Sequence, residues 1–240
     1  DSALVQLEPE YITVSNDSKT AYVSLQENNA IATVDLENGE ILSVKGLGVK
    51  DHSVEGNEID AHNKDGINIQ KLPLLSFYMP DAIDTFTVGG KTYIITPNEG
   101  DARDWDAYSE ETELKEIEDK IKLNAENYQG YTQEELDAFI ADGGLKKLEK
   151  IKLTKENGLN ENGEYEALYA FGGRSFSIFD AETMDLVFDS GSDFEKIIAE
   201  KVPQHFNVDN EEVEVDNRSD NKGPEPESAV VGEIDGKLYA

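Results

Sequence analysis

A short unit that recurs three times constrains the fold of this chain more than any other feature. Each copy opens with a proline followed by an acidic residue, at Glu8-Pro9-Glu10, Met79-Pro80-Asp81 and Glu225-Pro226-Glu227. A strand-like run, a polar turn and a second run follow, and the second run contains a tyrosine: Tyr22, Tyr93 or Tyr239. One such unit cannot bury its apolar side alone, so copies must stack to form a core.

The first copy carries the most complete set of strand signals. Residues 11–15 and 20–25 are rich in β-branched and aromatic side chains and flank a polar turn. Residues 30–35 and 40–44 flank Asn38-Gly39, a strong hairpin signal. Four antiparallel strands within about forty residues match the size of a propeller blade.

The second copy is interrupted, and the third contains only its beginning. Strand signals at 83–88 and 92–96 continue, after a long gap, at 175–180 and 186–189. The predicted fold class is therefore mainly β: a partial β-propeller of four-stranded antiparallel blades with a helical insertion. The predicted parts are 1–104 (first blade and start of the second), 105–158 (helical insertion), 159–191 (rest of the second blade), 192–222 (helix and acidic loop) and 223–240 (start of the third blade).

Helix signals fill the interruption and recur after the second copy. Glu-to-Lys pairs four residues apart and an apolar stripe at Leu114, Ile117 and Ile121 predict a helix over 111–122. A capping box at Thr132 predicts a second helix, which ends near Gly143. A short amphipathic segment with Leu145, Leu148 and Ile151 follows. After the second copy, a further helix is predicted to begin at Ser192, to bury Ile197 and Ile198, and to end at Pro203.

Composition limits the classes of partner. The formal net charge is −31, and no basic stripe is present to neutralise phosphates, so nucleic acid and anionic membrane surfaces are not expected partners. No apolar run reaches membrane-spanning length. The absence of cysteine excludes disulfides and thiolate metal sites.

Blade geometry sorts the loops into two faces. The turns within hairpins are short, whereas the longer connections, 46–69, 98–104, 172–174 and 217–226, are polar and charged. Long loops on one side of a rigid scaffold are the usual place for binding residues, so this face is the expected working face.

Oxygen-bearing side chains on that face suit a hard cation such as Ca²⁺ or another divalent ion. The candidate metal ligands are Asp60, Glu99, Asp101 and Asp104. Further candidates for the site are Asp51, His52, Asp65, Asp220 and Glu225. The alternative is that these loop residues are simply turn formers whose side chains satisfy the local backbone.

Two arginines, Arg103 and Arg174, are candidate anion-binding residues because a guanidinium presents fixed donors to a carboxylate or phosphate. Acidic residues lie close to both in sequence, so structural ion pairs are the alternative. His52 could be a general base, a ligand or a hydrogen-bonded loop residue. No Ser-His-Asp order, phosphate loop or paired-His metal motif is present.

Several motifs resemble those of the choice-of-anchor I family. They are Leu7–Ile12, Tyr22–Asn29, Asn98–Asp104, Phe171–Phe176 and Gly223–Glu227. The resemblance implies an exported or surface-attached bacterial propeller protein of a kind often labelled phytase-like esterase or alkaline phosphatase. It also implies that this chain is a portion of a longer propeller. His62-Asn63 stands where the family pattern suggests a Ser-Asp pair.

Two functional hypotheses follow. The first is an extracellular, cell-surface or periplasmic propeller module whose acidic loop face binds a cation, a carbohydrate or a protein partner. The second is a metal-dependent phosphoester hydrolase with Asp60, Glu99, Asp101 and Asp104 as ligands and Arg103 or Arg174 on the phosphate. The hydrolase requires these carboxylates to converge on one point. In either case the open edge of the repeat must be covered by further blades of a longer chain or by another copy.

Overall fold

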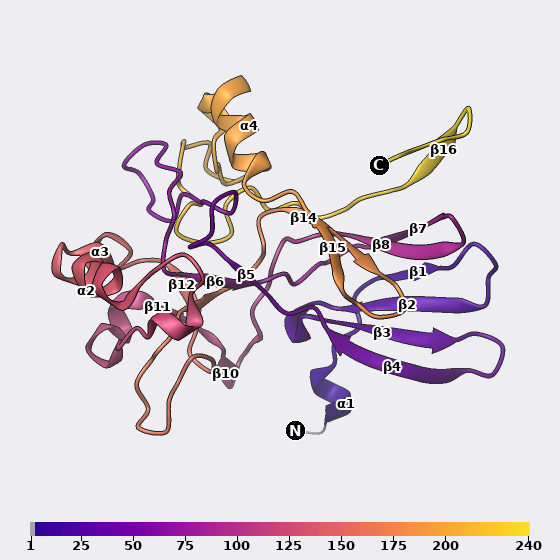
Figure 1. Ribbon diagram of the computed structural model, residues 1–240, viewed down its shortest axis with the longest axis horizontal. Helices are drawn as coiled ribbons and strands as arrows, with labels where there is room; N and C mark the ends of the chain where they lie inside the picture. Colours follow the sequence, from indigo (N-terminus) through magenta and orange to yellow (C-terminus); the bar gives the residue numbers. More distant parts are fainter. Residues whose placement is uncertain (1–2) are drawn as a thin grey trace.

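The computed structural model describes residues 3–240 and consists mainly of antiparallel β-sheets, with a helical region at one end (Figure 1). The first sheet is formed by β1 (Ile12–Val14), β2 (Thr20–Leu25), β3 (Ala30–Asp35) and β4 (Glu40–Gly46), paired antiparallel in chain order. The four strands predicted for the first copy are confirmed.

The second sheet joins strands that are far apart in the sequence. Its order is β7 (Asp84–Val88), β8 (Lys91–Pro97), β14 (Phe176–Asp180) and β15 (Leu186–Asp189). In the pairing of β8 with β14, Pro97 lies opposite Phe176. These two residues are the ones that flank the long interruption in the sequence. The prediction that these four runs form one antiparallel unit is confirmed.

The two sheets pack face to face around a common core. Tyr22 and Ile31 of the first sheet join Ile94 and Phe179 of the second in one buried cluster. Their first strands, β1 and β7, also meet through the Thr13 hydroxyl, which donates to Asp84 Oδ1 at 3.1 Å. The apolar side of one unit is thus covered by the next unit, as the repeat requires.

All three copies open with the same unusual backbone conformation. The residue before each proline has a positive φ: 42° at Glu8, 50° at Met79 and 43° at Glu225. This conformation is unfavourable for residues other than glycine, so its recurrence at the same position marks a common structure. The third copy continues as an exposed hairpin of β16 (Gly232–Ile234) and β17 (Lys237–Tyr239).

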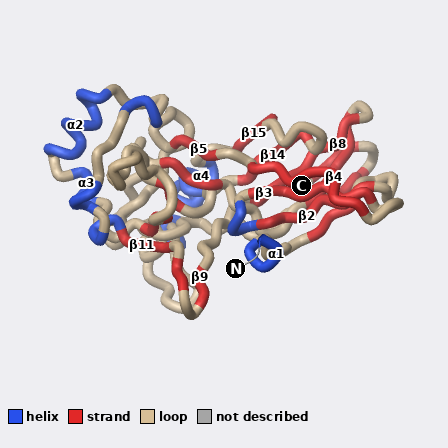
Figure 2. Tube along the Cα trace, turned by 90° about the horizontal axis from the view of Figure 1, so that it is seen from below, coloured by secondary structure: helices blue, strands red, loops and turns tan. Residues whose placement is uncertain are grey.

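The interruption folds around a separate core at the loop end. A five-stranded sheet runs in the order β11 (Glu111–Glu113), β12 (Lys152–Thr154), β13 (Tyr169–Ala170), β6 (Leu75–Phe77) and β5 (Val49–Asp51), with β13 and β6 parallel. Two short helices, α2 (Gln133–Ala141) and α3 (Gly144–Lys147), lie at the outer edge (Figure 2). Leu136, Ile151 and Leu153 are fully buried between these elements. The remaining elements are α1 (Ala3–Gln6), β9 (Asp104–Trp105), β10 (Tyr108–Ser109), α4 (Asp193–Lys201) and the 3₁₀ turns Gln26–Asn28, Leu114–Glu116, Glu118–Lys120, Ala125–Asn127 and Pro203–His205.

The helix predicted over 111–122 is wrong. This segment forms β11 and two 3₁₀ turns. Lys152 of the neighbouring β12 lies 2.8 Å from Glu111 and 3.5 Å from Glu113, so charge pairs across strands replace the expected pairs along a helix. The apolar stripe is nevertheless buried, because the tight turns still direct Leu114 and Ile117 into the core.

The other helix predictions are confirmed in position but not in every detail. α2 begins with the expected capping box, in which Thr132 and Glu135 exchange hydrogen bonds. α4 follows Ser192, but the Ser192 hydroxyl donates to Gly56 O instead of capping the helix. Ile197 was expected to be buried and is 54% exposed, whereas Glu195 points into the protein.

The two classes of loop lie at opposite ends of the molecule. The hairpin turns of both sheets are at one end, and the long connections and the helical region are at the other (Figure 1). Within residues 3–240, no helix combines the length and the apolar character needed to cross a membrane. The predicted site residues belong to the long connections and therefore lie at the loop end.

Candidate functional site

Three aspartates from two distant loops converge at the loop end. One carboxylate oxygen of each of Asp60, Asp65 and Asp216 lies within 4.8 Å of the others. Among the side chains of residues 5–240, this is the one group of three or more acidic or histidine residues with that spacing. Asp60 and Asp216 are each 1% exposed, whereas Asp65 faces solvent.

Backbone amides fix the two buried carboxylates. Asp60 accepts hydrogen bonds from the amides of His62 at 3.2 Å and Asn68 at 2.6 Å, which closes the loop between them. Asp216 accepts from the amides of Asp65 at 3.1 Å and Gly66 at 3.0 Å. Both carboxylates therefore accept hydrogen bonds from backbone amides of the loop that carries Asp65. These bonds hold the side chains of Asp60 and Asp216 in place.

The electrostatics of the cluster are unfavourable for three free carboxylates. Burial raises the pKa of Asp60 to about 6, and the charges of Asp216 and Glu195 add to this effect. A hard cation would relieve the repulsion, since Ca²⁺ and Mg²⁺ prefer oxygen ligands. A pocket of 180 Å³ borders the cluster at Asp65 and extends past His62 and Asn68 to Asp142 and Lys147 near α2 and α3. His62 Nδ1 lies 2.9 Å from Asp65.

Arg174, a candidate anion-binding residue, lies beneath the cluster. It is 2% exposed and forms an ion pair with the buried Glu195 at 2.9 Å. Its guanidinium also donates to the carbonyls of Asp60, Ser219 and Asn221 at 2.6–2.8 Å. These partners leave no accessible donor for a phosphate, so the geometry corresponds to the structural ion pair.

The other proposed ligands lie in different surroundings from Asp60. Glu99 lies 3.3 Å from Lys222 and accepts from Gln26. Asp101 is exposed and accepts from the amide of Ala102, and Asp104 lies exposed in β9. The structure therefore separates the four carboxylates that the hydrolase hypothesis needs at one point.

Arg103 pairs with Glu110 at 3.1 Å and donates to Asn28 Oδ1 at 2.6 Å. Its carboxylate partner is thus a residue of the insertion rather than one of the acidic residues beside it in sequence. Asp220 is half-buried, and burial raises its pKa. Glu225 forms an ion pair with Arg218.

His52 and Asp51 organise the loop instead of facing solvent. His52 is fully buried, with Nδ1 2.7 Å from Asn57 O and Nε2 2.8 Å from Ser76 Oγ. Burial lowers the pKa of His52 to about 3, so it is neutral near pH 7. Asp51 accepts from the amides of Ser53 and Gln129, which ties this loop to the insertion.

A second acidic region forms where the three repeat openings meet. Burial raises the pKa of Asp81, and the charges of Glu99, Glu10 and Glu227 raise it further. Glu10, Asp81 and Glu227 are the acidic residues that follow the three prolines. The repeat thus brings its acidic residues together, a consequence of stacking that the sequence did not make explicit.

Glu27 has the most strongly raised pKa in this second acidic region. Burial raises the pKa of Glu27 to about 7, and the carboxylates of Glu8, Glu10 and Asp101 contribute. One of its carboxylate oxygens is buried without a hydrogen-bond partner among the described residues.

Replacement of Glu27 by glutamine is expected to change how stability depends on pH. The raised pKa means that the folded protein binds this proton more tightly than the unfolded chain, so the wild type loses stability as pH rises from about 4.5 to about 7. The loss is expected to be about 1 kcal/mol after discounting for solvent screening. Urea unfolding of wild type and Glu27→Gln at pH 5 and pH 8 measures the difference. Parallel pH profiles for the two proteins would contradict the assignment.

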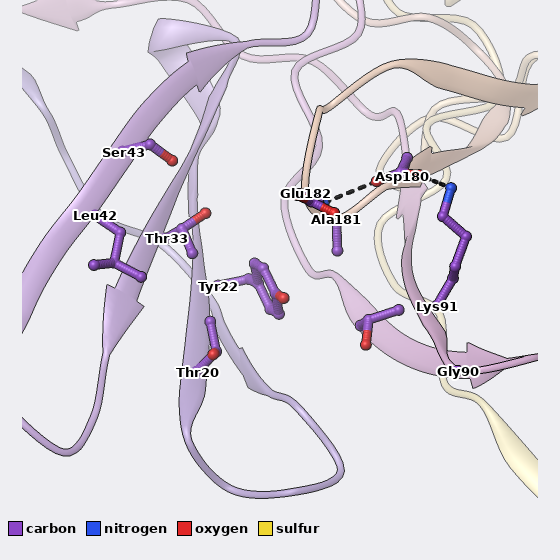
Figure 3. A pocket seen from close by; sticks show the side chains of 11 residues that line it. Thr20, Tyr22, Thr33, Leu42, Ser43, Gly90, Lys91, Asp180, Ala181 and Glu182 are labelled. Carbon is purple, nitrogen blue, oxygen red and sulfur yellow. Dashed lines mark hydrogen bonds and ion pairs between the residues drawn. The ribbon is translucent and has the colours of Figure 1, made fainter.

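The hairpin end carries a groove of different character. It has a volume of 420 Å³ and lies between the two sheets (Figure 3). Hydroxyls of Thr20, Thr33 and Ser43 line one side, and Tyr22 lies between the two sheets. Lys91 and Asp180 form a 2.7 Å ion pair on the other side.

Stacked antiparallel repeats with carboxylate clusters at one end define a mainly β protein with an acidic loop surface. The chain belongs to the choice-of-anchor I family, because that domain matches residues 1–240. The family expected from the motifs is thereby confirmed.

Two curated proteins are similar to this chain. The chain is 34% identical over 257 residues to a mesenchyme-specific cell surface glycoprotein of Strongylocentrotus purpuratus, and the match covers 96% of this chain and 32% of that protein. It is 38% identical over 89 residues to Gigasin-3a of Magallana gigas, covering 35% of this chain and 31% of that protein. The matches thus span about a third of the length of each relative. No solved structure matches the chain.

Proposed function

We propose that this chain is an extracellular or cell-surface module that binds a divalent cation at Asp60, Asp65 and Asp216. The observation that carries the proposal is the convergence of these three carboxylates, two of them buried, beside a pocket. The surface location is supported by the family and by the relative that is named a cell surface glycoprotein.

The ion that fits this donor set best is Ca²⁺. All three ligands are carboxylates, and the oxygen-bearing side chains of Asn68 and Asp142 line the adjoining pocket. Water would complete the shell on the exposed side of Asp65. The site is held by loop backbone on two sides, so the cation would join the loops around Asp65 and Asp216 and stabilise them.

The scaffold of the module is, in this proposal, a propeller. Two four-stranded antiparallel units pack face to face, their first strands meet, and the residues that follow the three prolines converge. This is the arrangement expected when blades radiate from one axis. The long loops then form one rim, and the cation site is part of that rim.

Calcium binding is tested by thermal unfolding and calorimetric titration at pH 7.5. A ligand at 100 times its Kd stabilises the folded state by about 2.7 kcal/mol, so the midpoint of unfolding should rise with Ca²⁺. Asp65→Asn is the preferred variant because Asp65 is exposed, and it should abolish the rise. The affinity should also increase as pH rises through about 6, since protonated Asp60 cannot serve as an anionic ligand.

Asp101→Asn provides the matched control, because Asp101 is also exposed but lies in the Asn98–Asp104 loop. It should leave the Ca²⁺ effect unchanged. Equal losses in both variants would indicate diffuse attraction by the acidic surface and contradict the proposed site. A wild type that binds none of Ca²⁺, Mg²⁺ or Mn²⁺ would contradict it as well.

A further inference from the structure

The interface between the first and second sheets changes from apolar to polar toward the hairpin turns. In an antiparallel sheet, residues directly opposite each other share one face. One such row crosses all four strands of the first sheet on the side of the second sheet, and each of its members carries a hydroxyl: Thr13, Tyr22, Thr33 and Ser43. The next position on this side toward the loop end is Ile31, which is fully buried in the core shared by the two sheets.

The groove of 420 Å³ lies where this polar row meets small residues of the second sheet. Gly90, Thr92 and Ala181 line the opposite wall and leave the space between the sheets open. A second hollow of 310 Å³ adjoins the groove, since Thr20, Tyr22, Gly90 and Thr92 line both. Sites for small ligands have volumes of about 300–1,000 Å³, so the groove can hold one. Both walls are four-stranded sheets that lie within this chain.

Tyr22 places an unpartnered hydroxyl at the groove. Its side chain is only 7% exposed and belongs to the core cluster. Buried tyrosine hydroxyls usually have a hydrogen-bond partner. The Tyr22 hydroxyl has none among the side chains and backbone of residues 5–240, and it is not one of the polar atoms sealed from solvent. It is therefore available to a molecule that enters the groove.

The other hydroxyls of the groove wall are equally free. The dashed lines in Figure 3 join Asp180 to Lys91 and to Glu182, and none reaches Thr20, Thr33 or Ser43. A hydroxyl can both donate and accept, so a row of them suits a ligand that carries many hydroxyls of its own. Leu42 is the one large aliphatic side chain of the lining, which is too little apolar surface for the side chains of a peptide.

Charge at the groove selects among hydroxyl-rich ligands. Lys91 is paired with Asp180 at 2.7 Å, and Lys45 Nζ donates to the carbonyl of Glu182 at 2.6 Å. The acidic side chains of Asp17 and Asp180 are close enough to raise the pKa of Tyr22 further after burial, which is the main cause. Paired lysines and nearby carboxylates disfavour an anionic ligand.

We propose that this groove binds a neutral carbohydrate. Tyr22, Thr20, Thr33 and Ser43 exchange hydrogen bonds with the sugar hydroxyls, and Leu42 contacts the apolar side of a sugar ring. The site lies at the hairpin end, opposite the cation site, and does not depend on it. The working face expected from the long loops would then be one of two.

Amide NMR spectra of the isotope-labelled protein test this site during titration with neutral hexasaccharides of glucose, mannose, xylose and N-acetylglucosamine. At least one should shift the amide signals of Thr20, Thr33, Ser43 and Thr92. An anionic alginate hexasaccharide and a neutral Gly-Ser peptide of similar length should not. Asp65→Asn, in the proposed cation site, should bind the sugar like the wild type.

Tyr22→Phe removes the hydroxyl and keeps the ring in the core. It should weaken sugar binding about 2- to 10-fold, the loss of one hydrogen bond, without lowering stability toward urea. Thr33→Val/Ser43→Ala should weaken binding about 10-fold. Tyr93→Phe is the matched control: Tyr93 occupies the same repeat position in the second sheet but does not line the groove, so its loss should leave binding unchanged.

Four results would each overturn the proposal. They are the absence of a shift with all four neutral sugars, shifts confined to the loop end, stronger binding of alginate or the peptide, and unchanged affinity in both groove variants. A loss of stability in Tyr22→Phe would contradict it as well, because the hydroxyl would then have a partner within the protein.

Discussion

Replacement of Arg174 by methionine is expected to lower the free energy of unfolding by about 3–5 kcal/mol. The change leaves Glu195 as a buried charge without its cation, and it removes the donors to the carbonyls of Asp60, Ser219 and Asn221. Urea unfolding at pH 7 measures the loss. The slope of the free energy of unfolding against urea concentration should stay unchanged, as expected for two-state unfolding of both proteins.

Lys196→Met is the matched control for this prediction. Lys196 pairs with Glu58 at 2.9 Å, but its side chain is 49% exposed, so its loss should change stability by less than about 1 kcal/mol. The double variant Arg174→Met/Glu195→Gln should recover part of the stability, because it removes the unpaired charge. A single variant as stable as the wild type would show that Arg174 is not the residue that joins these loops.

Replacement of Gly172 by alanine is expected to lower the free energy of unfolding by about 2–5 kcal/mol, the sum of left-handed backbone strain and overpacking. Gly172 has a φ of 80°, and a Cβ there would lie 2.0 Å from the carbonyl oxygen of Glu99. Gly100 faces it, and a Cβ on Gly100 would lie 2.3 Å from the Gly172 nitrogen. The two loops touch through their backbones, so neither can retreat without moving the strand that carries it.

Gly39→Ala separates the two causes. Gly39 has a similar φ of 69°, but no atom lies within 4 Å of the point that a Cβ would occupy, so only the backbone strain of about 1–2 kcal/mol applies. Chemical unfolding of both variants should show the larger loss for Gly172→Ala. Equal losses would mean that the contact between the two loops contributes nothing.

The strands could be predicted from the sequence because their signals are local. Residues 20–25 and 30–35 alternate around short turns, and they pair as expected. The pairing of β8 with β14 was predictable despite its long separation because the repeat supplied the template. The run 111–122 failed for the opposite reason: its charge spacing suits a helix, but strand pairing with β12 and burial of Leu114 and Ile117 decided the structure.

The candidate site was only partly predictable. Asp60 and Asp65 were identified from loop composition, but their partner Asp216 comes from a segment about 150 residues away, and only the fold brings it to them. Arg174 was expected to find an acidic residue near it in sequence, and its partner is Glu195 on α4. Spacing along a chain does not reveal contacts that depend on how loops from different copies fold over one another.

The long interruption of the second sheet also has a consequence for how this chain reaches its structure. All strands of the first sheet lie within residues 12–46, so its contacts are local and form without closing a long loop. β8 and β14 can pair only after the whole segment between Pro97 and Phe176 has been looped out, and loop closure of this size costs entropy before any contact forms. We therefore expect the first sheet to fold early, with the second sheet and the cation site completed last.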